Sequence, residues 1–375
     1  TAVLGSGSTA TGQAVVSGGT WNATTMVVGN LGSGTLALTG GRVAIAGGTG
    51  TLTLAASAGS RGTLNVGTGS TAGVLAASTV SGGSGVSALT FNHTSGSYTF
   101  APNITGAGLV LSHTGSGQTI LTGTGTYGGG TVIRGGTLAV GPTGVLVHGG
   151  TSMVVAGGSG EIAALTVSGS VSTGVGLIGS GSGATGLVTV DTGTWTTGTL
   201  PLVVGQLGAG TLSLTGSTAR VSTGLASVGS LVGSSGSASL TGGTLVSTGD
   251  LQVGDAGTGW LTLASGSVGG VNAVVGNAAT GAGTIVMSGG TWTTSAGVTL
   301  GGLGRGTLSL SSGVLSGSTA VLGSGSAATG LATVSGGTWN NTGSFTVANL
   351  GSGTLALTGG RVAIAGGTGT LTLAA

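Results

Sequence analysis

The sequence predicts an all-β protein, a parallel β-helix (β-solenoid) with about 23–24 residues and three short strands in each turn. Three observations lead to this prediction: a short motif that recurs at a steady spacing, apolar residues that alternate with polar ones inside it, and glycines at its corners. A steady period in the twenties is typical of stacked repeat architectures, in which each repeat buries its apolar face against its neighbours.

The motif reads glycine, threonine, leucine, any residue, leucine, as in Gly34–Leu38. From Gly186 onward its copies follow one another at a nearly constant interval. The glycines that open these copies are Gly186, Gly210, Gly236, Gly259, Gly283, Gly306, Gly330 and Gly353. Because apolar and polar residues alternate within each copy, the motif predicts a strand with one buried face.

Two further strands complete each predicted turn. One follows a glycine pair, as in Gly41-Arg42-Val43, and the other is a run such as Val27-Val28-Gly29. Glycine supplies the positive φ that corners between strands need. Helix is disfavoured because 91 of the 375 residues are glycine, which costs about 1 kcal/mol per helical position relative to alanine. Threonines expected at equivalent outward positions are Thr35, Thr51, Thr211, Thr307 and Thr354.

Composition supports order and excludes several classes of protein. Apolar residues make up 38% of the chain, which is more than disordered chains contain. The six arginines are scattered singly, and this pattern does not predict nucleic-acid binding, which needs clustered positive charge. No apolar run approaches the roughly 20 residues of a spanning helix, so no membrane insertion is expected within this segment. The absence of cysteine excludes a disulfide framework.

A long repeat is superimposed on the short one. Residues 1–22 recur at 319–340 with few differences, and residues 30–56 are identical to residues 349–375. This indicates recent duplication of a unit of about 318 residues, so we expect a tandem array. The predicted organisation is β-solenoid coils at 1–78, an atypical β-solenoid segment at 79–141, further coils at 142–318, and the start of the next copy at 319–375.

The atypical segment contains a distinctive stretch. Residues 119–140 read Thr-Ile-Leu-Thr-Gly-Thr-Gly-Thr-Tyr-Gly-Gly-Gly-Thr-Val-Ile-Arg-Gly-Gly-Thr-Leu-Ala-Val. Together with the lead-in at Leu89–Asn92 and Ile104–Leu111, this stretch resembles the autotransporter-associated β-strand repeat. The resemblance implies a secreted β-helix, like an autotransporter passenger, that is extracellular or on the surface of a Gram-negative bacterium. These residues include no C-terminal membrane barrel, so the resemblance does not define the export route.

Carboxylates are too few to predict an enzyme. β-Helix lyases and hydrolases need paired carboxylates or a base beside them, and this chain offers Glu161, Asp191, Asp250 and Asp255. Asp250 and Asp255 fall at strand edges, where aspartate commonly stabilises turns. Glu161 and Asp191 are little more than one turn apart, without a third partner. We therefore predict no catalytic residues and no enzymatic activity.

The histidines do not predict a metal site. His93 and His113 are separated by close to one turn of sequence, which predicts that they stack on neighbouring coils. A metal would need a third ligand and supporting carboxylates, so stacked surface histidines are the favoured interpretation for these two and for His148. No metal and no cofactor is expected.

The tryptophans divide into two groups. Trp21, Trp195, Trp292 and Trp339 follow glycine and threonine in a slot that other turns fill with Val43 or Leu245, so they are predicted to be core aromatic residues. Trp260 instead replaces the outward threonine of its turn, which makes it the candidate exposed contact residue.

Two functions from different classes remain. The favoured hypothesis is a structural protein: a long extracellular filament whose partner is itself, through tandem or end-to-end continuation and lateral bundling. Open β-helix ends recruit further strands unless they are capped, and a surface with little charge permits lateral packing. The alternative is an adhesin stalk that presents a host- or matrix-binding surface, for which the 79–141 segment is the candidate region.

Overall fold

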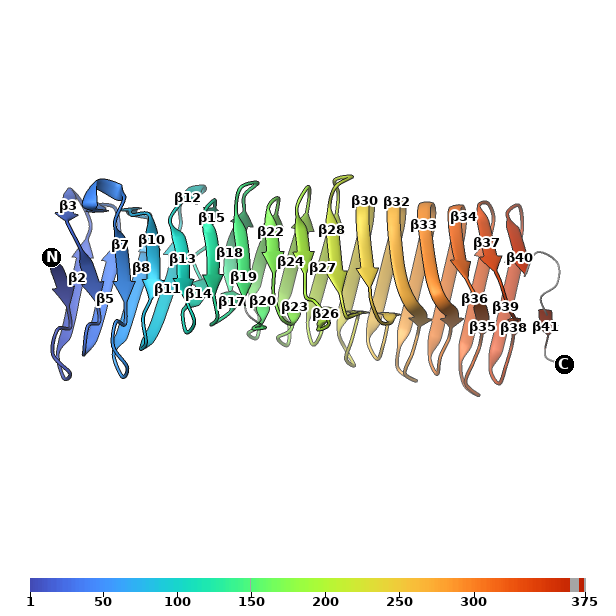
Figure 1. The fold of residues 1–375 in the computed structure, drawn as a ribbon. Coiled ribbons are helices and arrows are strands. Elements are labelled where there is room, and N and C mark those ends of the chain that lie inside the picture. The colour runs from blue at the N-terminus through green and yellow to red at the C-terminus, as the bar shows by residue number, and fades with distance from the viewer. Residues whose placement is uncertain (149, 365–370, 374–375) are drawn as a thin grey trace. The chain divides into compact units, whose positions relative to one another are not determined.

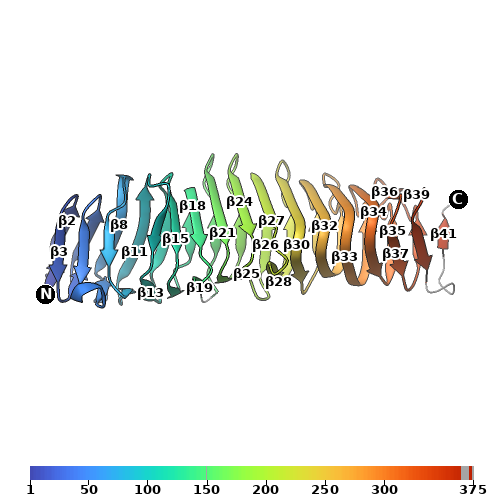
Figure 2. The ribbon, with the colours of Figure 1, turned by 90° about the horizontal axis from the view of Figure 1, so that it is seen from above.

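The computed structural model describes residues 1–148, 150–364 and 371–373. The chain forms two compact units: unit 1 comprises Thr1–Ala156 with Ile162–Gly174, and unit 2 comprises Gly157–Glu161 with Val175–Ala375. Within each unit, short strands stack in parallel on their equivalents in the next coil (Figures 1 and 2). The predicted fold class, a parallel β-solenoid, is confirmed. The described residues contain one short 3-10 helix, η1 (Ala46–Gly48).

Unit 1 has three columns of strands. The first column contains β2 (Thr11–Val16), β5 (Ser33–Leu38), β8 (Arg61–Ser70), β11 (Val86–His93), β14 (Val110–His113), β17 (Thr131–Ile133) and β20 (Met153–Val155). The second contains β3 (Thr20–Ala23), β6 (Arg42–Ile45) and β9 (Val74–Ala76) as one sheet, and β12 (Tyr98–Phe100), β15 (Gln118–Leu121), β18 (Gly135–Val140) and β21 (Ile162–Val167). The third contains β1 (Ala2–Leu4), β4 (Met26–Val28), β7 (Thr51–Leu54), β10 (Thr79–Gly82), β13 (Asn103–Gly106), β16 (Thr124–Tyr127), β19 (Val145–His148) and β22 (Ser170–Ser172).

Unit 2 repeats this arrangement with longer strands that bend around the corners. Its motif strands are β24 (Thr185–Val190), β27 (Ala209–Leu214), β30 (Ser235–Ser247), β32 (Thr258–Val275), β33 (Ala282–Leu300), β34 (Arg305–Gly317), β36 (Thr329–Val334) and β39 (Ser352–Leu357). The others are β23 (Gly176–Ile178), β25 (Thr194–Thr196), β26 (Pro201–Val204), β28 (Arg220–Thr223), β29 (Leu225–Val228), β31 (Leu251–Val253), β35 (Thr319–Leu322), β37 (Thr338–Asn341), β38 (Phe345–Val347), β40 (Arg361–Ile364) and β41 (Leu371–Leu373).

The register of unit 2 reproduces the period of the sequence. The eight motif glycines from Gly186 to Gly353 pair in succession, so each step between them is one coil. From β24 to β36 the inward leucines and their apolar equivalents are buried, whereas the intervening positions, mostly threonine and serine, point outward. The alternation expected for a half-buried strand therefore places an aliphatic column inside.

Glycine at one corner is favoured by the close approach of the next coil. Gly205 has φ of 74°, and a Cβ on it would lie 2.2 Å from the backbone oxygen of Ser235. Both constraints favour glycine, which alone adopts positive φ without steric cost. Alanine occupies this corner at Ala55, Ala156 and Ala348, each with positive φ.

The recurring motif changes column inside unit 1. Strands β2, β5, β8 and β11 are motif strands of the first column and pair in succession. Further along the chain, the motif strand β18 lies in the second column, paired with β15 and β21. The first column meanwhile continues through β14 and β17 to β20, a Met-Val-Val run. Residues 86–140 therefore move the motif by one column, within the segment predicted to be atypical.

Candidate functional site

Buried tryptophans fill one slot of the solenoid wall. The slot is a continuous register in unit 2, occupied in turn by Trp195, Val221, Leu245, Val268, Trp292, Leu315, Trp339 and Val362. Trp195, Trp292 and Trp339 are buried, whereas Trp21, which pairs with Val43 in unit 1, is half-buried. The same residue type is less covered at Trp21 because β3 pairs with a neighbouring strand on one side only.

Trp260 lies on the outer face of a sheet in unit 2. It is 45% exposed and pairs with Ser237 on one side and Thr284 on the other. Its outward row also contains Thr211, Thr307 and Thr354. In unit 1, Thr35 holds the corresponding position of β5, but Thr51 does not. Thr51 lies in β7 of the third column and pairs with Thr79, so its predicted equivalence was wrong.

The carboxylates cap turns or bridge coils. Asn277 Nδ2 donates to Asp255 Oδ1 at 2.8 Å, and Asn272 Nδ2 donates to Asp250 Oδ1 at 2.9 Å. In each pair the two residues lie 22 residues apart on successive coils. Glu161 Oε2 accepts from the Gly158 backbone N–H at 2.8 Å. Asp191 Oδ1 accepts from the Thr192 backbone N–H at 2.7 Å. These contacts are structural, as expected for carboxylates at strand edges.

The histidines are in the core and not on the surface. His93 and His113 are fully buried and His148 is 2% exposed, so the surface interpretation was wrong. The two rings do meet across neighbouring coils, with centroids 5.7 Å apart, but they lie edge to face at 77° and are not stacked, because Phe91 and not His93 is the register partner of His113. Strand alternation explains the burial: each histidine stands two residues after a buried residue on the inward face of its strand.

A buried polar network surrounds these histidines, and its only signal in the sequence is the concentration of His, Tyr and Phe in one segment. His93 Nε2 lies 2.8 Å from Thr119 Oγ1. Thr131 Oγ1 lies 2.6 Å from the Tyr127 hydroxyl and 2.8 Å from His148 Nε2. Burial raises the pKa of Tyr98 to about 12 and also raises the pKa of Tyr127. Both tyrosine hydroxyls are therefore neutral at pH 7, and the hydrogen bonds of the network hold the coils together without charge.

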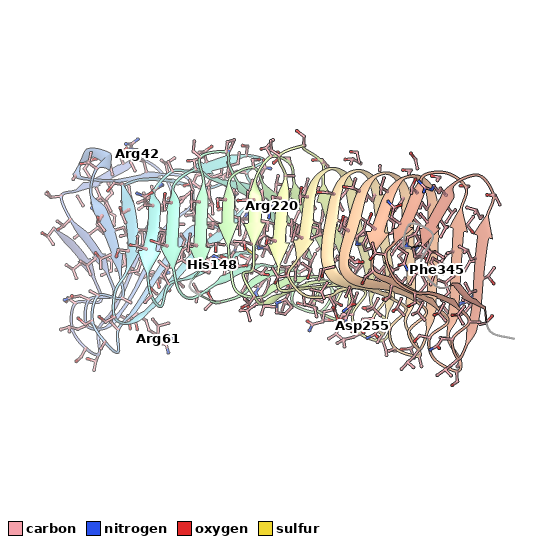
Figure 3. The ribbon with its side chains drawn as sticks, turned by 45° about the vertical axis from the view of Figure 1, so that its right-hand side comes forward. Arg42, Arg61, His148, Arg220, Asp255 and Phe345 are labelled. Carbon is pink, nitrogen blue, oxygen red and sulfur yellow. The ribbon has the colours of Figure 1, made fainter. Side chains whose placement is uncertain are left out.

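The arginines lie outside this interior. Figure 3 shows Arg42 and Arg61 at the outer edges of unit 1, whereas His148 lies within its walls. Arg220, Arg305 and Arg361 of unit 2 are exposed as well. Among the described residues, no group of three or more His, Asp or Glu side chains is arranged to hold a metal ion. No described helix is long and apolar enough to cross a membrane.

No family model matches the chain, no curated protein is similar to it in sequence, and no solved structure matches it.

Proposed function

We propose that this chain is a structural β-solenoid from a tandem array, in which units of about 318 residues extend one filament. The β-solenoid fold is consistent with a structural protein or a stalk. The tandem array in particular is supported by the strand pairing within the two copies of the repeated sequence, residues 1–56 and 319–375.

Both copies of the repeat adopt the same register. Ala2 pairs with Met26 in the first copy, and the corresponding Ala320 pairs with Phe345 in the second. The equivalences extend to the other two columns. There the first copy pairs Thr11 with Ser33 and Thr20 with Arg42, and the second pairs Thr329 with Ser352 and Thr338 with Arg361. The repeated sequence therefore encodes its own stacking, whichever residues precede it.

The observation that carries the proposal is the start of the second copy. Strand β36 of the second copy pairs with β34, which belongs to the preceding copy, through Arg305 and Thr329. It also pairs with β39 of the second copy, through Thr329 and Ser352. These two steps are as long in sequence as the two steps before them, from Thr258 to Ala282 and from Ala282 to Arg305. One repeat thus continues into the next as if it were another ordinary coil.

The coil spacing sets the expected length of one repeat in such an array. At about 4.8 Å per coil and 13–14 coils, the axial rise per repeat is about 65 Å.

Location and lateral association are further parts of the proposal. The resemblance of residues 79–141 to autotransporter repeats supports an extracellular or cell-surface location. Charged residues are 3% of the chain, so little electrostatic repulsion opposes side-by-side packing of filaments.

Electron cryo-microscopy of the native material tests the array. We expect a continuous β-solenoid with a rise of about 65 Å per repeat. Discrete particles of one unit would overturn the tandem filament.

The second candidate function is an adhesin stalk, favoured by the exposure of Trp260 on an uncharged, hydroxyl-rich face. Interfaces are enriched in tryptophan at their contact centres. An immobilised chain would then bind a host or matrix surface, and Trp260→Ser would weaken binding at least 10-fold, which is about 1.4 kcal/mol. Equal binding by both chains would remove this residue from any adhesive role.

A further inference from the structure

The ionisable side chains buried in unit 1 gather in one stretch, residues 86–148, here named the histidine coils. They contain the three histidines and both tyrosines of the chain. Rings contact one another there both within a coil, as Phe91 does with Phe100 at 5.1 Å, and between neighbouring coils, as Tyr127 does with His148 at 4.8 Å. The stretch coincides with the place where the motif changes column.

His113 is held in its neutral form by the geometry of its one hydrogen bond. Its Nδ1 lies 2.8 Å from the backbone oxygen of Gly135. Because a carbonyl oxygen only accepts, Nδ1 carries the hydrogen, and Nε2 is then the unprotonated nitrogen. Nε2 is buried and has no hydrogen-bond partner among the described residues. A second proton on this nitrogen would create a buried charge with no acceptor.

His148 ends a chain of hydroxyl groups. The Tyr127 hydroxyl lies 2.6 Å from Thr131 Oγ1, which lies 2.8 Å from His148 Nε2, so the three groups can share two hydrogen bonds when Nε2 is the acceptor. With a proton on Nε2 this nitrogen becomes a donor to Thr131 Oγ1, the Thr131 hydrogen must go to the Tyr127 oxygen, and the Tyr127 hydrogen loses its acceptor. His148 Nδ1 is also buried without a described partner. The network therefore favours an unprotonated Nε2, because a second proton on this ring removes the acceptor of the Tyr127 hydroxyl and places a charge in the interior.

The titratable groups whose rings face the histidines are Tyr98, Tyr127 and the histidines themselves, and none of them carries a negative charge at pH 7. The four Asp and Glu residues of the chain, Glu161, Asp191, Asp250 and Asp255, belong to unit 2. A proton on one buried imidazole is therefore opposed by desolvation, and protons on both His93 and His113 are also opposed by their like charge.

We propose that the histidine coils are an acid-sensitive segment of the solenoid: protonation of the buried imidazoles opens residues 86–148 while the histidine-free coils of unit 2 stay folded. The inference is independent of the tandem array, because it depends on unit 1 alone. In an array it would place one acid-sensitive segment in every repeat.

The expected pH range follows from the direction of the shifts. Burial lowers the pKa of His93 below 6.5, and lowers the pKa values of His113 and His148 to about 4. A depressed histidine pKa means that the folded state binds its proton less tightly than the unfolded state does. Stability is therefore complete above pH 6.5 and is lost as the pH falls toward 4. For His113 and for His148, the unfolding equilibrium shifts on the order of 100-fold by pH 4.5.

Hydrogen exchange of the full chain at pH 7.5, 6, 5 and 4.5, corrected for intrinsic exchange rates, tests the inference. We expect protection in residues 86–148 to fall at least 100-fold between pH 7.5 and pH 4.5, and protection in residues 209–357 to change less than 10-fold. Equal loss in both regions, or retained protection of the histidine coils at pH 4.5, would overturn the proposal.

Two further measurements keep the result specific to the histidines. The variant His113→Phe/His148→Phe removes two imidazoles but keeps ring volume, and it should lose most of the acid response. Trp292→Phe is the matched control in unit 2 and should leave the acid response of residues 86–148 unchanged. If the double variant fails to fold, NMR titration of the histidine Cε1–H signals in the unaltered chain decides. Native-state titration near pH 6.5 for all three rings would exclude the mechanism.

Discussion

The two compact units are built from the same kind of coil but carry opposite sets of ionisable groups. Unit 1 contains every histidine and tyrosine and no Asp or Glu, whereas unit 2 contains all four carboxylates and no histidine. The buried polar side chains described in unit 2, such as Thr223 and Asn341, do not ionise. A shared backbone repeat thus carries buried ionisable rings in one unit and none in the described part of the other, and the acid-sensitive segment proposed above depends on this difference.

The difference is concentrated where the repeat is least regular. In the regular coils of unit 2 the motif returns once per coil and presents aliphatic side chains inward. In the histidine coils the paired residues are closer in sequence, with Leu111 opposite Thr131 and Gln118 opposite Thr137. Bulky rings occupy the interior of these shorter coils. Departure from the repeat thus coincides with the appearance of ionisable rings in the interior.

The largest expected effect comes from removing a ring in unit 2. Trp292→Ala deletes a fully buried indole between Val268 and Leu315, and should cost about 3–5 kcal/mol of unfolding free energy. Because no ionisable group is involved, the cost should be the same at pH 7.5 and pH 5. Urea unfolding at both pH values measures it, and a cost that grows on acidification would contradict the proposed difference between the units.

Much of unit 2 could be predicted from sequence, because its glycine frame sets strand positions and the alternation within each strand sets which side chains point inward. For this reason the sequence predicted the inward slot shared by Trp195, Trp292 and Trp339. It also predicted the outward position of Trp260. Sequence alone failed in the histidine coils. There the motif changes column, and no glycine frame fixed the inward face at His93 or His113.

The predicted equivalence of Thr51 with the motif threonines was wrong for a related reason. Its context, Thr-Leu-Thr-Leu, has the same alternation as a motif strand but belongs to the third column. Alternation identifies a strand and its buried face, but it does not identify the column in which that strand is stacked. The hydrogen bonds of Tyr127, Thr131 and His148 were equally beyond reach, because they join residues of different strands whose inward orientation was unknown.

Replacing a buried ring of unit 2 with histidine tests whether burial of an imidazole is sufficient to make the fold of that unit acid-sensitive. Phe345 is fully buried and its ring contacts Trp339 at 4.9 Å. Phe345→His should cost about 2–4 kcal/mol at pH 7.5 from lost apolar burial and an unpaired polar group. Below pH 6.5 the cost should rise by up to about 1.4 kcal/mol per pH unit. The comparison is urea unfolding against Phe345→Leu, which should show no such rise.

A smaller effect is expected from breaking the hydroxyl chain in unit 1. Thr131→Val keeps the shape of the side chain but leaves the Tyr127 hydroxyl and His148 Nε2 without their common partner. The expected cost is about 1–3 kcal/mol at pH 7.5. Adding Tyr127→Phe removes one of the two stranded groups and should recover part of that loss. Additive costs in this double-mutant cycle would show that the three groups do not form one network.

The smallest effect is expected at the exposed face of unit 2. Trp260→Ser replaces an indole that is 45% exposed with the residue type found one coil away at Ser237. Surface substitutions of this kind usually change stability by less than about 0.5 kcal/mol, and this one should do so equally at pH 7.5 and pH 5. Urea unfolding provides the measurement. A loss comparable to that of Trp292→Ala would mean that the indole packs against the solenoid wall and is part of its structure. A negligible loss leaves Trp260 free for contacts with other molecules, so that a binding defect in the same variant would report on recognition and not on folding.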